Sequence, residues 1–171
     1  NLISRFQCTN CVLSSLGATI TRDTRIGLPF ATGGSMEQFD ATQNGGILKG
    51  SGSFQRVNAE GRWYAPLAQI GGGPLGGGLQ FVLGFTAKSG FVWGDPGPHF
   101  RQLFALGGTQ FGIPLRGYDE FAITPRGFNP NAGSNTASVD AFGQAFFAAT
   151  SEIGMRVSQM IYINGFFDAG N

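Results

Sequence analysis

Arg116 is the residue in this chain with the strongest need for a chemical partner. It is the only cation within the largely apolar run 106–118. A guanidinium shielded from water requires a partner, because an unpaired buried charge is costly. Asp168, near the other end of the chain, is the best candidate for a bidentate ion pair. The alternative is a surface turn in which Arg116 pairs with Asp119 or Glu120.

No set of residues suited to catalysis or metal binding is evident. His99 is the only histidine, and no Ser or Cys nucleophile lies beside it. The glycine-rich run 71–78 is followed by Leu79 and Gln80, whereas a phosphate-binding loop needs Lys and Ser or Thr at that point. We therefore expect no enzyme activity, no catalytic or metal site and no cofactor.

The composition favours a protein rich in β-structure. The chain has 171 residues, enough for one domain, and its charged share of 12% is about half the usual value. Glycine and phenylalanine are frequent, at 29 and 17 residues. A β-rich soluble domain and a β-barrel that turns its apolar side to lipid both fit these numbers. The net charge of +1 provides no bulk field for nucleic acid.

Targeting and membrane signals are limited. No run approaches the roughly 18 apolar residues of a transmembrane helix, and no signal peptide is present. The chain begins at Asn1 without a methionine and stops within a strand-like motif. We therefore expect it to be a fragment of a longer protein.

Apolar and polar residues alternate along six segments, which predicts about six antiparallel strands and no long helix. The segments are 12–23, 35–43, 54–67, 79–94, 139–157 and 161–171. The fourth segment alternates most clearly, with Leu79, Phe81, Leu83 and Phe85 on one face and Gln80, Thr86 and Lys88 on the other. The same parity places Asp168 on the polar face of the last segment. Between the fourth and fifth segments lies the irregular region 95–137, and a loop of this length is usually functional.

Three short motifs lie in order along the chain. The hairpin motif consists of Asp23, Thr24 and Arg25, followed by Pro29 and by Gly33-Gly34-Ser35. The loop motif consists of Gly107, Gly108, Leu115, Arg116, Gly117 and Tyr118. The strand motif is Phe166-Phe167-Asp168-Ala169-Gly170-Asn171. In this order the three resemble the motifs of the BamA-type outer-membrane protein assembly family.

The resemblance implies an all-β fold, an antiparallel transmembrane β-barrel of about sixteen strands. Residues 1–171 would form part of its C-terminal barrel domain, and upstream POTRA domains and the closing strands would lie outside this chain. In the family, the loop motif lies on the sixth extracellular loop, which folds back into the barrel lumen. This matches Arg116 to an anchoring contact with Asp168.

The function that the resemblance implies is the folding and insertion of client barrel proteins into the bacterial outer membrane. The partners implied are outer-membrane lipid, client barrels and periplasmic accessory lipoproteins, with no nucleic acid. Two alternatives stay open: a two-partner secretion transporter of the same superfamily, and a soluble β-sandwich used for binding. For Asp23, Thr24 and Arg25, solvated charges at a strand end are the simpler interpretation.

Cys8 and Cys11 allow four interpretations. A redox Cys-x-x-Cys usually caps a helix in a βαβ unit, and nothing nearby looks helical. A zinc site needs two further ligands, and His99 is the only histidine. Two free thiols are the third interpretation. A local disulfide on an extracellular loop best fits an envelope protein, because that compartment is oxidising.

Overall fold

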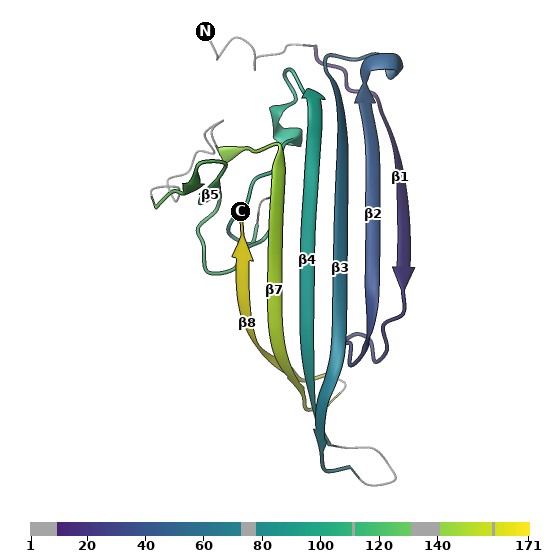
Figure 1. Cartoon of the computed structure of the whole chain (residues 1–171), viewed down its shortest axis with the longest axis vertical. Coiled ribbons are helices and arrows are strands. Elements are labelled where there is room, and N and C mark those ends of the chain that lie inside the picture. The colour runs from purple at the N-terminus through teal and green to yellow at the C-terminus, as the bar shows by residue number, and fades with distance from the viewer. Residues whose placement is uncertain (1–9, 73–77, 111, 131–140, 159) are drawn as a thin grey trace.

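The protein is built on one open antiparallel sheet. The computed structural model describes residues 10–72, 78–110, 112–130, 141–158 and 160–171. Six strands lie side by side in the order β1-β2-β3-β4-β7-β8 (Figure 1). They are β1 (Ser15–Asp23), β2 (Gly34–Gly45), β3 (Ser53–Ile70), β4 (Leu79–Asp95), β7 (Ala145–Arg156) and β8 (Tyr162–Gly170). The all-β, antiparallel fold expected from the alternation is confirmed.

The remaining elements are short. The long loop between β4 and β7 contains the 3-10 turn η2 (Phe100–Gln102) and a small hairpin of β5 (Ile123–Thr124) and β6 (Gly127–Phe128). A second 3-10 turn, η1 (Gly46–Leu48), joins β2 to β3. Within the part of the chain that the structure describes, no helix is long and apolar enough to cross a bilayer.

Strand boundaries differ from the expected ones most clearly in β2, β3 and β7. β2 is a regular strand of 12 residues and is longer than the expected segment 35–43, because it pairs with β1 on one side and β3 on the other. β3 continues to Ile70 across a register shift between Pro66 and Ala68, and a bulge suits a proline that cannot donate a ladder hydrogen bond. β7 begins only at Ala145, because the backbone of Gly143 pairs with the long loop. The first two residues expected in this strand, 139 and 140, lie outside the described residues.

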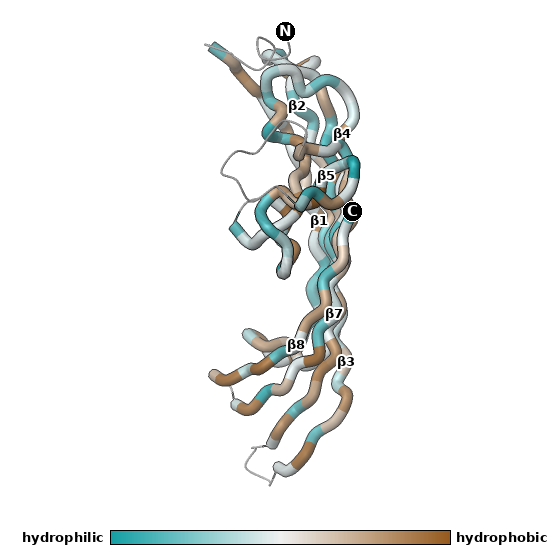
Figure 2. The backbone as a smooth tube through the Cα atoms, turned by 90° about the vertical axis from the view of Figure 1, so that its left-hand side faces the viewer, coloured by the Kyte–Doolittle hydropathy of each residue, from teal (hydrophilic) through white to brown (hydrophobic). Residues whose placement is uncertain are grey.

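The two faces of the sheet differ in character. Directly paired residues share a face, so the registers extend the alternation of one strand across the whole sheet. The outer face, as we call it, exposes the large apolar side chains Trp63, Leu83, Phe85, Phe91, Trp93, Phe147, Ile153, Ile163 and Phe167. If this face meets lipid, all four apolar residues that the alternation places on it should be exposed. Leu83 and Phe85 are exposed, whereas Leu79 and Phe81 are half-buried. Figure 2 shows hydrophobic stretches towards the lower ends of β3, β7 and β8.

The protein core lies on the opposite, inner face, where the long loop folds back onto the sheet (Figure 1). The strands contribute Phe54, Val92, Phe146 and Ala148, and the loop contributes Phe104, Leu106, Leu115 and Ile123. Gly90 of β4 makes room for this packing, because a Cβ there would lie 2.5 Å from both the Phe104 and the Phe146 rings. The loop is therefore part of the packed structure rather than an extension from the sheet edge.

The turn between β1 and β2 reaches towards the hairpin of β7 and β8. Phe30 of this turn stacks on Tyr162, with ring centroids 5.0 Å apart and an interplanar angle of 8°. Arg156 donates a hydrogen bond through Nη1 to the Gly27 carbonyl at 3.2 Å. These contacts connect the first hairpin to the last, past β3 and β4, and add to the tertiary support that the packed loop gives the sheet.

Candidate functional site

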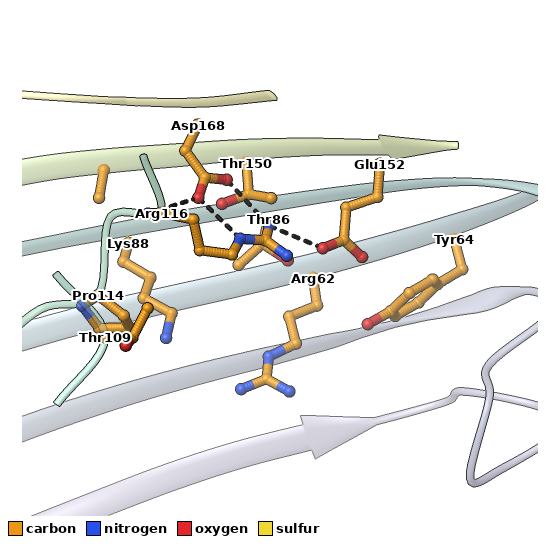
Figure 3. A pocket seen from close by; sticks show the side chains of 11 residues that line it. Arg62, Tyr64, Thr86, Lys88, Thr109, Pro114, Arg116, Thr150, Glu152 and Asp168 are labelled. Carbon is orange, nitrogen blue, oxygen red and sulfur yellow. Dashed lines mark hydrogen bonds and ion pairs between the residues drawn. The ribbon is translucent and has the colours of Figure 1, made fainter. Parts of the chain in front are cut away.

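Arg116 and Asp168 form a bidentate ion pair that joins the loop to β8 (Figure 3). Arg116 donates through Nε to Asp168 Oδ2 at 2.8 Å and through Nη2 to Oδ1 at 2.9 Å. The Arg116 main-chain N–H also donates to Oδ2, at 2.9 Å. The contact predicted from strand parity and the lone loop cation is thus present, and its geometry is the fork-to-fork arrangement that arginine makes and lysine does not.

Two further groups complete the cage around the guanidinium. Arg116 Nη2 also donates to Glu152 Oε1 at 2.8 Å, and the Arg116 Cζ atom lies 3.6 Å from the centroid of the Phe166 ring. β7 and β8 position these groups, because Glu152 pairs directly with Phe166 and Thr150 with Asp168. The cation therefore meets two carboxylates and one aromatic face, all on the inner side of adjacent strands.

Burial and charge favour this pair as an anchor. The Asp168 side chain is 3% exposed and that of Arg116 is 32% exposed. Hydrogen bonding to Asp168 raises the pKa of Arg116 above its usual value, so the loop guanidinium stays charged. A charge-assisted pair with a nearly buried carboxylate has a fixed geometry and resists replacement by water.

The sequence identified Asp168 but missed Glu152 and Phe166 as partners. Both were detectable in principle: Glu152 alternates with Thr150 on the polar face of its segment, and Phe166 is two residues from Asp168. Only Phe167 of the Phe-Phe pair follows the apolar pattern, and it is 70% exposed on the outer face. The strand motif therefore divides between the two faces of β8.

The alternative surface-turn pairing of Arg116 is wrong, because the arginine is occupied by Asp168 and Glu152. Glu120 has a different function within the loop. Its Oε1 accepts hydrogen bonds from the main-chain N–H groups of Thr109 and Gln110, at 2.7 and 2.8 Å. The carboxylate thus closes the turn that follows the two loop-motif glycines.

The loop-motif glycines allow a close approach of backbone segments. Gly107 has φ 117°, and a Cβ there would collide with the Asp119 carbonyl and lie 3.0 Å from the Ala122 amide nitrogen. Gly117 has φ 86° with open space around the Cβ position. Tyr118 lies against Phe128 of β6, edge to face, with centroids 5.9 Å apart. Gly108 resembles Gly107, because it has φ 65° and a Cβ there would collide with the Glu120 carboxylate. The motif therefore combines two glycines that neighbouring atoms require with one, Gly117, that requires only its conformation.

Leu115 and Gly170 form the apolar half of the anchor. Leu115 is almost fully buried, next to Arg116 in the chain. A Cβ on Gly170 of the strand motif would lie 3.2 Å from Leu115 Cδ1 and 3.3 Å from Leu106 Cδ2. The absence of a side chain at Gly170 thus lets two loop leucines sit against β8.

The hairpin motif closes its own turn. Arg25 donates through Nε and Nη2 to the two carboxylate oxygens of Asp23, at 2.9 and 2.6 Å. The Thr24 main-chain N–H donates to the Ser35 carbonyl at 2.8 Å. Asp23 is exposed, so its carboxylate is partly solvated, in agreement with the interpretation of solvated charges at a strand end. The carboxylate nevertheless forms a specific two-point ion pair with Arg25. The hairpin motif therefore stabilises the turn between β1 and β2, and the hydrogen bonds named here do not reach the loop motif.

The structure describes only one of the two cysteines for which a disulfide is predicted. Cys11 is disulfide-bonded, which excludes a free thiol there. Cys8 lies outside the described residues, so the pairing of Cys8 with Cys11 stays a prediction.

A polar cavity of about 330 Å³ lies between the loop and the inner face (Figure 3). Its walls are Arg62, Tyr64, Thr86, Lys88, Thr109, Pro114, Arg116, Ala148, Thr150, Glu152 and Asp168. Two of the three cations in these walls, Arg62 and Lys88, share a carboxylate, because Glu60 Oε1 lies 2.5 Å from Arg62 Nε and 3.6 Å from Lys88 Nζ. Among the described residues, no cluster of three or more His, Cys, Asp or Glu side chains could hold a metal ion.

An open antiparallel sheet with an exposed apolar face, and a polar face that holds a folded-back loop, is the wall of a membrane β-barrel. The family model of the Omp85 superfamily domain matches residues 5–171, and the chain belongs to this superfamily. Omp85 proteins are outer-membrane β-barrels, and they include BamA-type assembly factors and two-partner secretion transporters. A search of curated proteins found no match. Because the chain belongs to a family of β-barrels, the alternative of a soluble β-sandwich is wrong.

Proposed function

We propose that this chain is part of the barrel of a BamA-like factor, which folds client barrel proteins and inserts them into the bacterial outer membrane. The observation that carries the proposal is the loop held against the inner face by Arg116, Asp168, Glu152 and Phe166. A loop fixed there fills lumen space that an exported chain would need. The occupied lumen therefore favours the insertion of client barrels at the barrel wall over the export of a protein through the pore.

The proposed mechanism depends on hydrogen bonding at strand edges. In lipid, an unpaired edge has unsatisfied N–H and C=O groups, so it is a template for an incoming strand. Insertion by edge pairing needs no nucleophile and no cofactor. We assign this chain the wall and the lumen loop, and we assign the seam between first and last strands to other strands of the barrel.

The partners follow from this assignment. The outer face would meet outer-membrane lipid, because large apolar side chains are exposed there. Client barrels would approach at the seam. We further propose POTRA domains upstream of this chain, with periplasmic accessory lipoproteins bound to them, as in the BamA branch.

A reconstitution experiment tests the function. The full-length protein in lipid vesicles should accelerate the folding of a urea-unfolded eight-stranded client barrel, measured by its heat-modifiable gel migration. Empty vesicles and vesicles with a boiled sample are the controls. A second arm offers the same vesicles an unfolded exoprotein. If the exoprotein crosses the membrane while client folding stays at the rate of empty vesicles, the chain is a secretion transporter instead.

Lipid contact of the outer face gives a separate prediction. Trp63 and Trp93 are the only tryptophans and both are exposed on that face. In vesicles with brominated acyl chains, the fluorescence of both should be quenched, because bromine quenches by contact. A Trp63→Phe variant isolates the signal of Trp93. Strong quenching by aqueous iodide with none by brominated lipid would place these side chains in water and contradict the assignment.

A further inference from the structure

We propose that Arg22 of β1 and Glu37 of β2 bind the headgroup of a zwitterionic phospholipid on the outer face, with the phosphate on Arg22 and the primary ammonium group on Glu37. Arg22 pairs directly with Glu37, and Glu37 pairs directly with Gly61 of β3. Gly61 is two residues from Trp63, so all of these residues lie on the outer face. The inference requires a barrel in the outer membrane, but it does not require that the barrel inserts clients.

The pair ends the apolar outer surface of β1 and β2. The outward side chains between the pair and the other end of these strands include Leu16, Ala18 and Ile20 in β1 and Phe39 and Ala41 in β2. A charged side chain on the lipid side of a barrel is costly at the middle of the bilayer and tolerated near its interfaces. Arg22 and Glu37 therefore mark the level at which lipid headgroups begin beside these two strands.

The pair lies towards the end of the sheet opposite the long loop. Arg22 is followed by the last residue of β1, Asp23, and then by the turn to β2 (Figure 1). In outer-membrane barrels the short turns are periplasmic and the longer loops are extracellular. The headgroups at this level therefore belong to the periplasmic leaflet, which consists of phospholipids. β3 continues past this level to Ile70, so its wall borders the pair on one side.

Both charged groups have hydrogen-bonding capacity left for a ligand. Arg22 Nη1 and Glu37 Oε2 are 3.6 Å apart, which is close enough for an ion pair but too far for a hydrogen bond. Glu37 Oε2 is covered and has no hydrogen-bond partner, while the side chains of Arg22 and Glu37 are 73% and 37% exposed. Asp23, next to Arg22 in the chain, is held by Arg25. A phosphate and an ammonium group can therefore add the hydrogen bonds that this pair lacks.

The pair favours a headgroup that carries both charges. Arg22 and Glu37 together have no net charge, so a headgroup with a phosphate and an ammonium group matches them charge for charge. The anionic headgroup of phosphatidylglycerol offers Glu37 no cation. The quaternary ammonium of phosphatidylcholine has no N–H to donate to the carboxylate. Phosphatidylethanolamine meets both requirements.

Trp63 provides an aromatic wall beside the carboxylate. A Cβ on Gly61 would collide with the Trp63 ring, so the indole lies over the backbone of the residue that pairs with Glu37. Trp63 also stacks on Phe85, with ring centroids 5.8 Å apart. Tryptophan is favoured at membrane interfaces because its ring is amphipathic. A further strand that paired with the edge of β1 would leave the site open, because outward side chains stand perpendicular to the sheet.

Native mass spectrometry of the full-length protein, released from nanodiscs of equimolar phosphatidylethanolamine and phosphatidylglycerol, tests the site. The parent should retain phosphatidylethanolamine over phosphatidylglycerol by about threefold. In Glu37→Gln this preference should disappear, because Arg22 still holds a phosphate while the ammonium group loses its partner. In Arg22→Gln the retained phosphatidylethanolamine should fall by about threefold. Arg126→Gln is the matched control, because Arg126 is an exposed loop arginine, and it should change neither quantity.

A parent that retains the two lipids equally would overturn the proposal, as would a Glu37→Gln variant that keeps the parent's preference. An Arg22→Gln variant that retains as much phosphatidylethanolamine as the parent would show that the guanidinium holds no phosphate, and would overturn it too. Heat-modifiable gel migration checks that each variant is folded. Because no client is present, these results stand apart from the proposed function: vesicles that fail to insert clients, with the expected lipid pattern, would refute the function and leave the lipid site.

Discussion

Arg116→Ala is expected to lower the free energy of unfolding by about 2–4 kcal/mol and to release the loop from β8. The loss is large because the change leaves two carboxylates, Asp168 and Glu152, without their cation. It falls below the full cost of an orphaned buried charge because Arg116 is partly exposed and water can enter beside it. Urea unfolding followed by gel migration measures stability, and the vesicle assay measures insertion.

A double-mutant cycle separates the pair from its surroundings. Asp168→Ala should cost less than Arg116→Ala, since Arg116 keeps its hydrogen bond to Glu152. The double variant should be little worse than Arg116→Ala alone, because it no longer buries the unpaired Asp168. Arg126→Ala is the matched control, an exposed loop arginine that should leave stability within about 0.5 kcal/mol of the parent. Losses that simply add would mean that the two residues act independently, and the anchor would have to be abandoned.

Gly107→Ala is expected to cost about 3 kcal/mol or more, because a positive φ and a backbone collision act together. Gly117→Ala should cost only about 1–2 kcal/mol, the strain of a positive φ alone. The pair is matched: both glycines lie in the loop motif with positive φ, but only the Cβ at Gly107 meets another segment, at Asp119 and Ala122.

The readouts are urea unfolding and the exchange of the Thr109 and Gln110 amides, which hydrogen-bond to Glu120. In Gly107→Ala the segment around Asp119 must move away, so these amides should lose protection. In Gly117→Ala they should keep it. Equal losses of stability and protection in the two variants would show that conformational strain, and not the close approach of the two segments, governs the loop motif.

The sequence determined most fully which side chains lie on which face of each strand. A period of two is a local property, so Asp168 could be placed on the polar face, and Leu83 and Phe85 on the apolar face, without knowledge of any neighbour. The need of Arg116 for a carboxylate was equally local, because it followed from one cation in an apolar run. These two facts, together with the family resemblance that matches Arg116 to Asp168, predicted the pair that the structure contains.

Other features depended on the register between strands and the path of the loop, which only the tertiary structure decided. Glu152 joins Arg116 because β7 pairs with β8 in one register, which sets Glu152 opposite Phe166. Phe104 meets Arg56 because the loop turns back over Gly90, and a sequence pattern does not specify that path. Alternation shows which face a side chain occupies, but contacts between distant segments arise from packing of the whole chain.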